Sequence, residues 1–94
     1  MAILRIQHPV PSYERWKAAF DDDPADRRAS GVLRYWIHRP VADPHFVMID
    51  LEFRTVEEAQ GLLHSMQRIW DTGRAPIGAP ETWIVDTVEN VELD

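Results

Sequence analysis

The sequence predicts an α+β protein of the ferredoxin-like type, with the order strand, helix, strand, strand, helix, strand. Four short segments alternate apolar and polar residues, which is the pattern of a half-buried β-strand. Two other segments repeat apolar residues every three or four positions, as an amphipathic helix does. Right-handed crossovers then place the strands in the spatial order 4-1-3-2, antiparallel throughout, with both helices on one face. We therefore expect a ferredoxin-like βαββαβ domain.

The first part of the chain predicts a strand and a helix. Residues 2–8 alternate, and two nearby prolines end the expected strand. Ser12 is a suitable N-cap for a helix over residues 13–20. Asp23 followed by proline is typical of a second helix start. We therefore expect one or two further helical turns over residues 24–30.

A central hairpin organises the expected sheet. Residues 32–38 and 45–53 alternate on either side of a turn that contains two prolines and an Asp. The strand register must bring like faces together. We expect the pairs Leu33 with Leu51, Tyr35 with Ile49, Ile37 with Val47, Arg34 with Asp50, and Trp36 with Met48. The first three pairs should face the helices, and the last two the opposite side.

The remaining segments complete the fold. Thr55, followed three residues later by Glu, is a capping-box signature for a helix over residues 56–70. Gly61 costs that helix about 1 kcal/mol relative to Ala, which indicates close packing there. Gly73 is a suitable stop for the helix, and residues 82–89 alternate as the last strand.

Composition narrows the class of protein. A chain of 94 residues can build one core, so we expect a single domain over residues 1–94. The net charge of −6 argues against a nucleic-acid partner, which needs a concentrated basic surface. The absence of cysteine excludes a disulfide framework and a thiolate metal site. Without a signal-peptide pattern or a bilayer-spanning apolar run, we expect a cytoplasmic protein with no membrane partner.

The sheet face opposite the helices mixes charged and large apolar side chains. A bare face with Trp and Met would expose too much apolar surface for a monomer. A second copy is the simplest cover, so we expect a homodimer with an isologous interface through the sheet. The side chains expected on this face are Arg5, Gln7, Arg34, Trp36, His38, Met48, Asp50 and Glu52.

The histidines do not predict a metal site. All four are scattered, and none of the close spacings of metal-binding motifs is present. On the expected register His38 and His45 point to opposite faces, so they are poor joint ligands. We expect no metal and no other cofactor.

Four side chains are candidates for catalysis. Asp50 beside Arg34 could act as a general base, with the Arg as an anchor for an anion. The alternative, which we favour, is a cross-strand ion-pair network in the dimer interface. Tyr35 and His64 are candidates because both border the expected aromatic pocket.

Two positions compete for a ligand: the sheet-to-sheet interface, and the gap between sheet and helices within one subunit. We predict the second, because long charged side chains crowd the first. Aromatic and Met side chains can repack around a flat guest, and residues 21–31 and 73–80 could gate the mouth. The ligand should be a small aromatic molecule. The predicted ligand-binding residues are Tyr13, Trp16, Tyr35, Met66 and Trp70.

The passages DDDPADRRASGVLRYWIHRP and FVMIDLEFRTVEEA, with the length and the order of elements, resemble small actinobacterial proteins of the dimeric α+β barrel superfamily. That group includes antibiotic-biosynthesis-monooxygenase-like proteins and small polyketide cyclases, and the resemblance covers nearly the whole chain. Its members range from cofactor-free oxygenases to cyclases, isomerases and haem-handling proteins, so the fold does not carry one function. The chain departs from the quinone-forming oxygenases, because its one Asn is Asn90, near the end of the sequence.

The resemblance and the aromatic residues lead to two hypotheses. The first is an enzyme without a bound metal that oxygenates or cyclises an aromatic or polyketide-like substrate. The alternative is a non-catalytic binding or stress-related protein with the same fold. A cavity with converging His, Tyr or Asp groups would favour the enzyme, and a filled core would favour the alternative.

Overall fold

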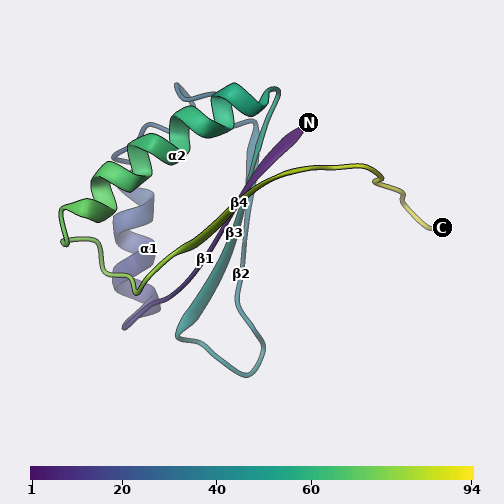
Figure 1. Cartoon of the computed structure of the whole chain (residues 1–94). Coiled ribbons are helices and arrows are strands. Elements are labelled where there is room, and N and C mark those ends of the chain that lie inside the picture. The colour runs from purple at the N-terminus through teal and green to yellow at the C-terminus, as the bar shows by residue number, and fades with distance from the viewer.

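The elements follow the predicted order. A computed structural model describes residues 1–94. Each strand is antiparallel to its neighbours in the order β2-β3-β1-β4, and both helices lie on one side of the sheet (Figure 1). This is the predicted ferredoxin-like βαββαβ fold. The elements are β1 (Ala2–Pro9), α1 (Tyr13–Asp21), β2 (Arg34–His38), β3 (Phe46–Phe53), α2 (Val56–Asp71) and β4 (Glu81–Asp86).

The core lies between the sheet and the helices, because alternation turns one apolar row of each central strand inward. Leu4 and Ile6 of β1, and Ile49, Leu51 and Phe53 of β3, are at most 1% exposed. The buried residues that the helices add to this core are Trp16, Phe20, Ala59 and Leu62.

Both helices begin at the predicted caps. Ser12 Oγ accepts a hydrogen bond of 3.3 Å from Arg15 N, and Thr55 Oγ1 accepts one of 3.1 Å from Glu58 N. Each bond satisfies a backbone donor that has no partner inside its helix. Beyond α2, Gly73 has a φ of 72°, the left-handed conformation that was predicted to stop this helix.

The helix predicted over residues 24–30 is wrong, since this segment forms turns. Asp23 and Asp26 have φ values of 54° and 50°, which a right-handed helix cannot accommodate. Their carboxylates accept hydrogen bonds from the backbone of Arg27 at 2.9 Å and of Ala29 at 3.3 Å. Such local bonds offer the backbone an alternative to the helical pattern.

The close packing predicted at Gly61 is also wrong, because a Cβ there would meet no atom within 4 Å. The position that favours glycine is Gly31, which has a φ of 101°, and a Cβ there would also require the carboxylate of Glu58 to move. Gly31 therefore lets the loop before β2 pass directly against the start of α2.

The register predicted between β2 and β3 is wrong by two residues. Tyr35 pairs with Leu51 and Ile37 with Ile49, while the loop after His38 is correspondingly longer. A shift of two keeps every side chain on its expected face, so alternation alone could not detect it. On the outer face the shift gives Arg34 opposite Glu52 and Trp36 opposite Asp50.

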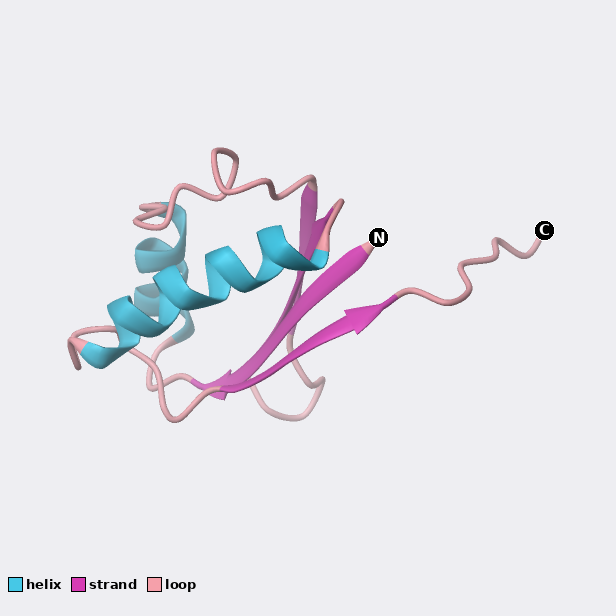
Figure 2. Cartoon of the chain, turned by 45° about the horizontal axis from the view of Figure 1, so that its top comes forward, coloured by secondary structure: helices cyan, strands magenta, loops and turns pink.

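The last strand is shorter than predicted, because β4 ends at Asp86 and not at residue 89. Residues 87–94 leave the sheet and run away from the rest of the chain without regular structure (Figure 2). Val88 and Leu93 in this segment are 94% and 92% exposed.

Candidate functional site

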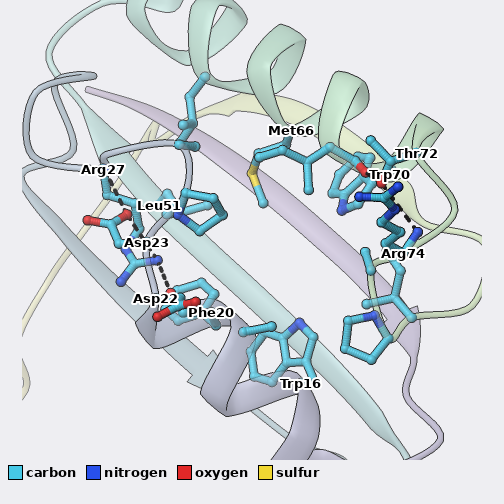
Figure 3. Close-up of a pocket in the computed structure, with 18 residues that line it drawn as sticks. Trp16, Phe20, Asp22, Asp23, Arg27, Leu51, Met66, Trp70, Thr72 and Arg74 are labelled. Atoms are coloured by element: carbon cyan, nitrogen blue, oxygen red, sulfur yellow. Dashed lines mark hydrogen bonds and ion pairs between the residues drawn. The ribbon is translucent and has the colours of Figure 1, made fainter.

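A cavity of about 250 Å³, which we call the main cavity, opens between the two helices and the sheet (Figure 3). Trp16 and Phe20 of α1 form one wall, and Met66 and Trp70 of α2 form the facing wall. Leu51 of β3 lies at its base. Of its 18 lining residues 11 are hydrophobic, so the cavity suits an apolar guest.

Two loops supply the polar lining. Asp22, Asp23 and Arg27 come from the loop after α1, and Thr72 and Arg74 from the loop after α2. Arg27 and Arg74 lie at opposite ends of the main cavity in Figure 3. Apart from Thr72, these residues lie in the stretches 21–31 and 73–80 that the sequence suggested as gates.

Three of the five predicted ligand-binding residues line the main cavity, and two lie outside it. Trp16, Met66 and Trp70 line the main cavity, whereas Tyr13 and Tyr35 do not. Tyr13 packs beside Trp16, with 5.8 Å between the ring centroids. Tyr35 borders a second cavity at the start of β2, so it lies near the site but outside its lining.

A row of four side chains crosses the outer face of the sheet. Trp36 pairs with Asp50, Asp50 with Arg5, and Arg5 with Trp83. Arg5 Nε and Nη2 donate hydrogen bonds of 2.8 and 2.9 Å to the two oxygens of Asp50. The two indoles thus flank a bidentate ion pair on the side of the sheet away from the main cavity.

None of the four candidate catalytic residues lines the main cavity. Asp50 is held by the ion pair just described. Arg34 Nε lies 2.9 Å from Glu52 Oε1, but that buried oxygen has no hydrogen-bond partner, so the contact is ionic and poorly directed. His64 is exposed on α2, and Tyr35 lies at the second cavity.

The sequence reasoning missed the polar residues of the main cavity. Asp23 was predicted to cap a helix over residues 24–30, which would have contained Arg27. In the turns their side chains meet instead, with 3.3 Å between Arg27 Nη1 and Asp23 Oδ1. The one signal available in the sequence was the density of acidic residues in this loop, which favour turns over helix.

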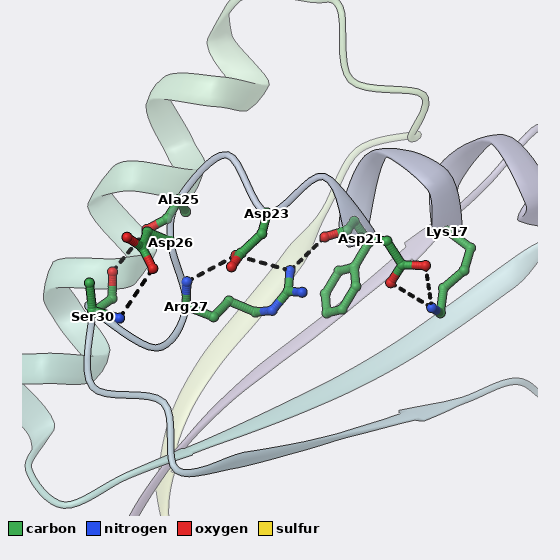
Figure 4. Close-up of polar contacts among 9 residues, drawn as sticks. Lys17, Asp21, Asp23, Ala25, Asp26, Arg27 and Ser30 are labelled. Atoms are coloured by element: carbon green, nitrogen blue, oxygen red, sulfur yellow. Dashed lines mark hydrogen bonds and ion pairs between the residues drawn. The ribbon is translucent and has the colours of Figure 1, made fainter.

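Side-chain bonds hold this loop in place (Figure 4). Ser30 Oγ donates to the carbonyl of Ala25 at 2.9 Å, and Lys17 Nζ binds both oxygens of Asp21 at the end of α1. Arg27 bridges the same region by donating from Nη1 to the carbonyl of Phe20. The wall of the main cavity is therefore ordered although it lacks regular structure.

No group of three His, Asp or Glu side chains within residues 1–94 is placed to hold a metal ion. Neither helix combines the length and the apolar character needed to cross a membrane.

His8 lies buried beneath the aromatic wall. Its ring centroid is 5.9 Å from that of Trp16, and Nδ1 donates to the carbonyl of Pro9 at 3.1 Å. Burial lowers the pKa of His8, and the bond to Pro9 only partly opposes this effect. The ring is therefore neutral in the folded protein near neutral pH.

The pKa of His8 predicts a loss of stability in mild acid. The unfolded chain has the ordinary pKa of about 6.5 and binds the proton more readily than the folded protein. The free energy of unfolding should therefore fall as the pH drops below about 6.5, by up to ~1.4 kcal/mol per pH unit from this group. Urea unfolding from pH 8 to 5 measures the slope. His8→Phe should flatten the profile over this range, and an unchanged profile would contradict the assignment.

Solved structures with the same fold cover nearly the whole chain. A candidate antibiotic biosynthesis monooxygenase from Deinococcus radiodurans gives a TM-score of 0.67 at 14% identity, over 100% of this chain and 99% of that one. SnoaB, a cofactor-independent oxygenase from Streptomyces nogalater, gives 0.76 at 10% identity, over 96% and 95%. A dimeric ferredoxin-like protein from an uncultured marine organism gives 0.64 at 10% identity, over 99% and 100%.

No family model matches the sequence, and no curated protein matches it. At identities this low, likeness between structures establishes the fold alone. The resemblance drawn from the sequence is confirmed at that level: the chain has the ferredoxin-like fold of antibiotic-biosynthesis-monooxygenase-like proteins.

Proposed function

We propose that this chain binds a small, flat, largely apolar molecule in the main cavity. The observation that carries the proposal is a space of about 250 Å³ between the indoles of Trp16 and Trp70 and the thioether of Met66. Aromatic rings stack favourably against one another, and Met adapts to irregular shapes. The volume lies slightly below the roughly 300 Å³ of the smaller ligand pockets. A molecule of two or three fused rings would fill it.

The proposal extends to catalysis, as a cofactor-free oxygenation or cyclisation of an aromatic or polyketide-like substrate. Its support is the shared fold with SnoaB, a cofactor-independent oxygenase. The carboxylate of Asp22 lines the cavity and makes no hydrogen bond or ion pair within the chain. A carboxylate so placed could act as a general base toward an acidic ring hydroxyl or C–H group.

A non-catalytic binding protein is the second candidate. No His or Tyr lines the main cavity, and Asp23 is paired with Arg27, so few acid–base groups converge there. Oxygen uptake with a hydroxylated three-ring aromatic separates the two candidates. Uptake above the protein-free rate supports the oxygenase, and saturable binding without turnover supports the binding protein.

We also propose a homodimer in which the outer faces of two sheets meet. Trp36 and Trp83 remain 39% and 44% exposed there, although indoles are usually mostly buried. The dimer would leave the main cavity of each subunit on the far side of its sheet.

The binding proposal makes a direct prediction with anthraquinone-2-carboxamide, a neutral three-ring probe. Titration should give saturable binding, with backbone amide shifts concentrated in residues 16–27 and 62–77, which contain most of the cavity lining. ¹H–¹⁵N correlation spectra measure both the affinity and the location. Shifts confined to the outer face of the sheet, or no saturation up to the solubility limit, would exclude the main cavity as the site.

A further inference from the structure

Arg27 stands between the main cavity and a second cavity. The second cavity, of about 320 Å³, lies beside the start of β2 and shares Asp23 and Arg27 with the main cavity. The Arg27 side chain is only 17% exposed. A largely buried cation that borders two open spaces is a strong determinant of what either space accepts.

The guanidinium of Arg27 is fixed in position before any ligand binds. Its central carbon lies 3.9 Å from the ring centroid of Phe20 and 5.2 Å from that of Tyr35, in cation–π geometry. Nη1 donates to the Phe20 carbonyl at 2.6 Å and lies 3.3 Å from Asp23 Oδ1. These contacts use Nη1 alone. Nε and Nη2 make no hydrogen bond within the chain, although the guanidinium carries five N–H donors.

The surroundings of these free donors are basic. Arg27, Arg28 and Arg34 line the second cavity, and Asp23 is the one acidic residue among its seven lining residues. Asp23 is paired with Arg27, and Arg34 with Glu52, whereas Arg28 makes no ion pair. Arg28 is therefore the one cation of the second cavity without a partner, and in a chain with a net charge of −6 it favours an anionic group beside the free donors of Arg27.

We propose that Arg27 determines the specificity of the main cavity and that the ligand is a flat aromatic acid. The ring system would lie between Trp16 and Trp70, and a carboxylate at its edge would accept hydrogen bonds from Nε and Nη2 of Arg27. The two donors form the planar fork that binds a carboxylate through both oxygens. This inference rests on the proposed binding function and adds the charge of the ligand.

The test compares two ligands of nearly the same shape, anthraquinone-2-carboxylate and its neutral amide, in which the charge is lost and one acceptor oxygen becomes an NH2 group. Charge-assisted hydrogen bonds at a desolvated Arg predict that the acid binds at least ~10-fold more tightly than the amide. Calorimetric titration of the wild-type protein gives both dissociation constants. Equal affinities would overturn the inference while leaving the binding function intact. Absence of binding by either ligand would instead overturn the binding function itself.

Two matched variants then locate the preference. In Arg27→Gln the ratio of the two affinities should fall to within about twofold of one, whatever happens to the amide. Arg15→Gln removes the same charge from an exposed position of α1 that lines neither cavity, and its ratio should stay near that of the wild type. A ratio kept in Arg27→Gln would overturn the role of Arg27, and a ratio lost equally in Arg15→Gln would show that the preference follows net charge alone.

A measurement on the wild-type protein keeps the test decisive if Arg27→Gln does not fold. The Nε–H resonance of Arg27 should move clearly further downfield with the acid than with the amide, because only the acid offers a charge-assisted hydrogen bond. Acetate at the same concentration tests whether a free anion is enough. A shift of equal size with acetate would overturn the inference, because the anion would then bind without the ring.

Discussion

Met66→Trp should abolish binding of a flat ligand to the main cavity while leaving the protein folded. The side chain of Met66 points into the space between α1 and α2, and an indole there would occupy volume that the ligand needs. We expect the affinity for anthraquinone-2-carboxamide to fall by at least ~100-fold, equivalent to about 2.7 kcal/mol. The added side chain fills existing space, so the free energy of unfolding should change little.

Gln67→Trp provides the matched control for this substitution. It adds the same side chain to the next position of α2, where the residue is exposed and does not line the cavity. The control should bind like the wild type. Unchanged affinity in a folded Met66→Trp protein would place the ligand elsewhere, with the interface between two sheets as the first alternative.

The second large effect concerns the proposed dimer. Trp36→Glu should raise the dissociation constant of the dimer by roughly 30- to 1,000-fold, the range for loss of a central aromatic at an interface. The substitution also places a carboxylate directly opposite Asp50 on β3, so like charges would face each other. Light scattering at micromolar concentration should show a dimer for the wild type and a monomer for the variant.

Val41→Glu is the control for that experiment, because Val41 lies fully exposed in the loop between β2 and β3, away from the sheet face. It introduces the same charge and should remain dimeric. A wild-type protein that is monomeric at micromolar concentration would contradict the proposed dimer directly.

The fold could be predicted from the sequence because every side chain that the central strands turn toward the helices in their middle is apolar. Leu4 and Ile6 on one strand, and Ile49 and Leu51 on the next, admit a single choice of buried face. The caps at Ser12 and Thr55 were equally readable, since each follows from a local hydrogen bond. These features depend on residues close together in the chain or on a period of two.

The register and the loop after α1 were beyond such reasoning for different physical reasons. A slip of two residues preserves every face, so only the packing of the sheet as a whole distinguishes Tyr35 opposite Leu51 from Tyr35 opposite Ile49. In the loop, an Asp–Pro pair is compatible with a helix start and also with a turn. The turn forms because Asp23 and Asp26 adopt the left-handed conformation, which no sequence pattern predicts.

The candidate site likewise contains some residues that a local pattern predicts and others that it does not. The aromatic walls could be predicted because Trp16, Met66 and Trp70 lie on apolar helix stripes. Arg27 could not, because its position depends on the turns and on the carbonyl of Phe20. The residues that would give the site its chemistry are those placed by irregular backbone, which is common where loops carry function.

The strand order also affects how this protein is made in the cell. The central strand β1 is the first to leave the ribosome, yet its two partners are β3 and β4, and Ala2 pairs with Asp86. Native pairing of β1 must wait until β3 and then β4 have been synthesised. Closing such long loops afterwards is entropically slow. Until then both edges of β1, with Leu4 and Ile6 uncovered, are open to strands of other nascent chains. Synthesis on crowded polysomes is therefore the stage at which this fold is most exposed to aggregation.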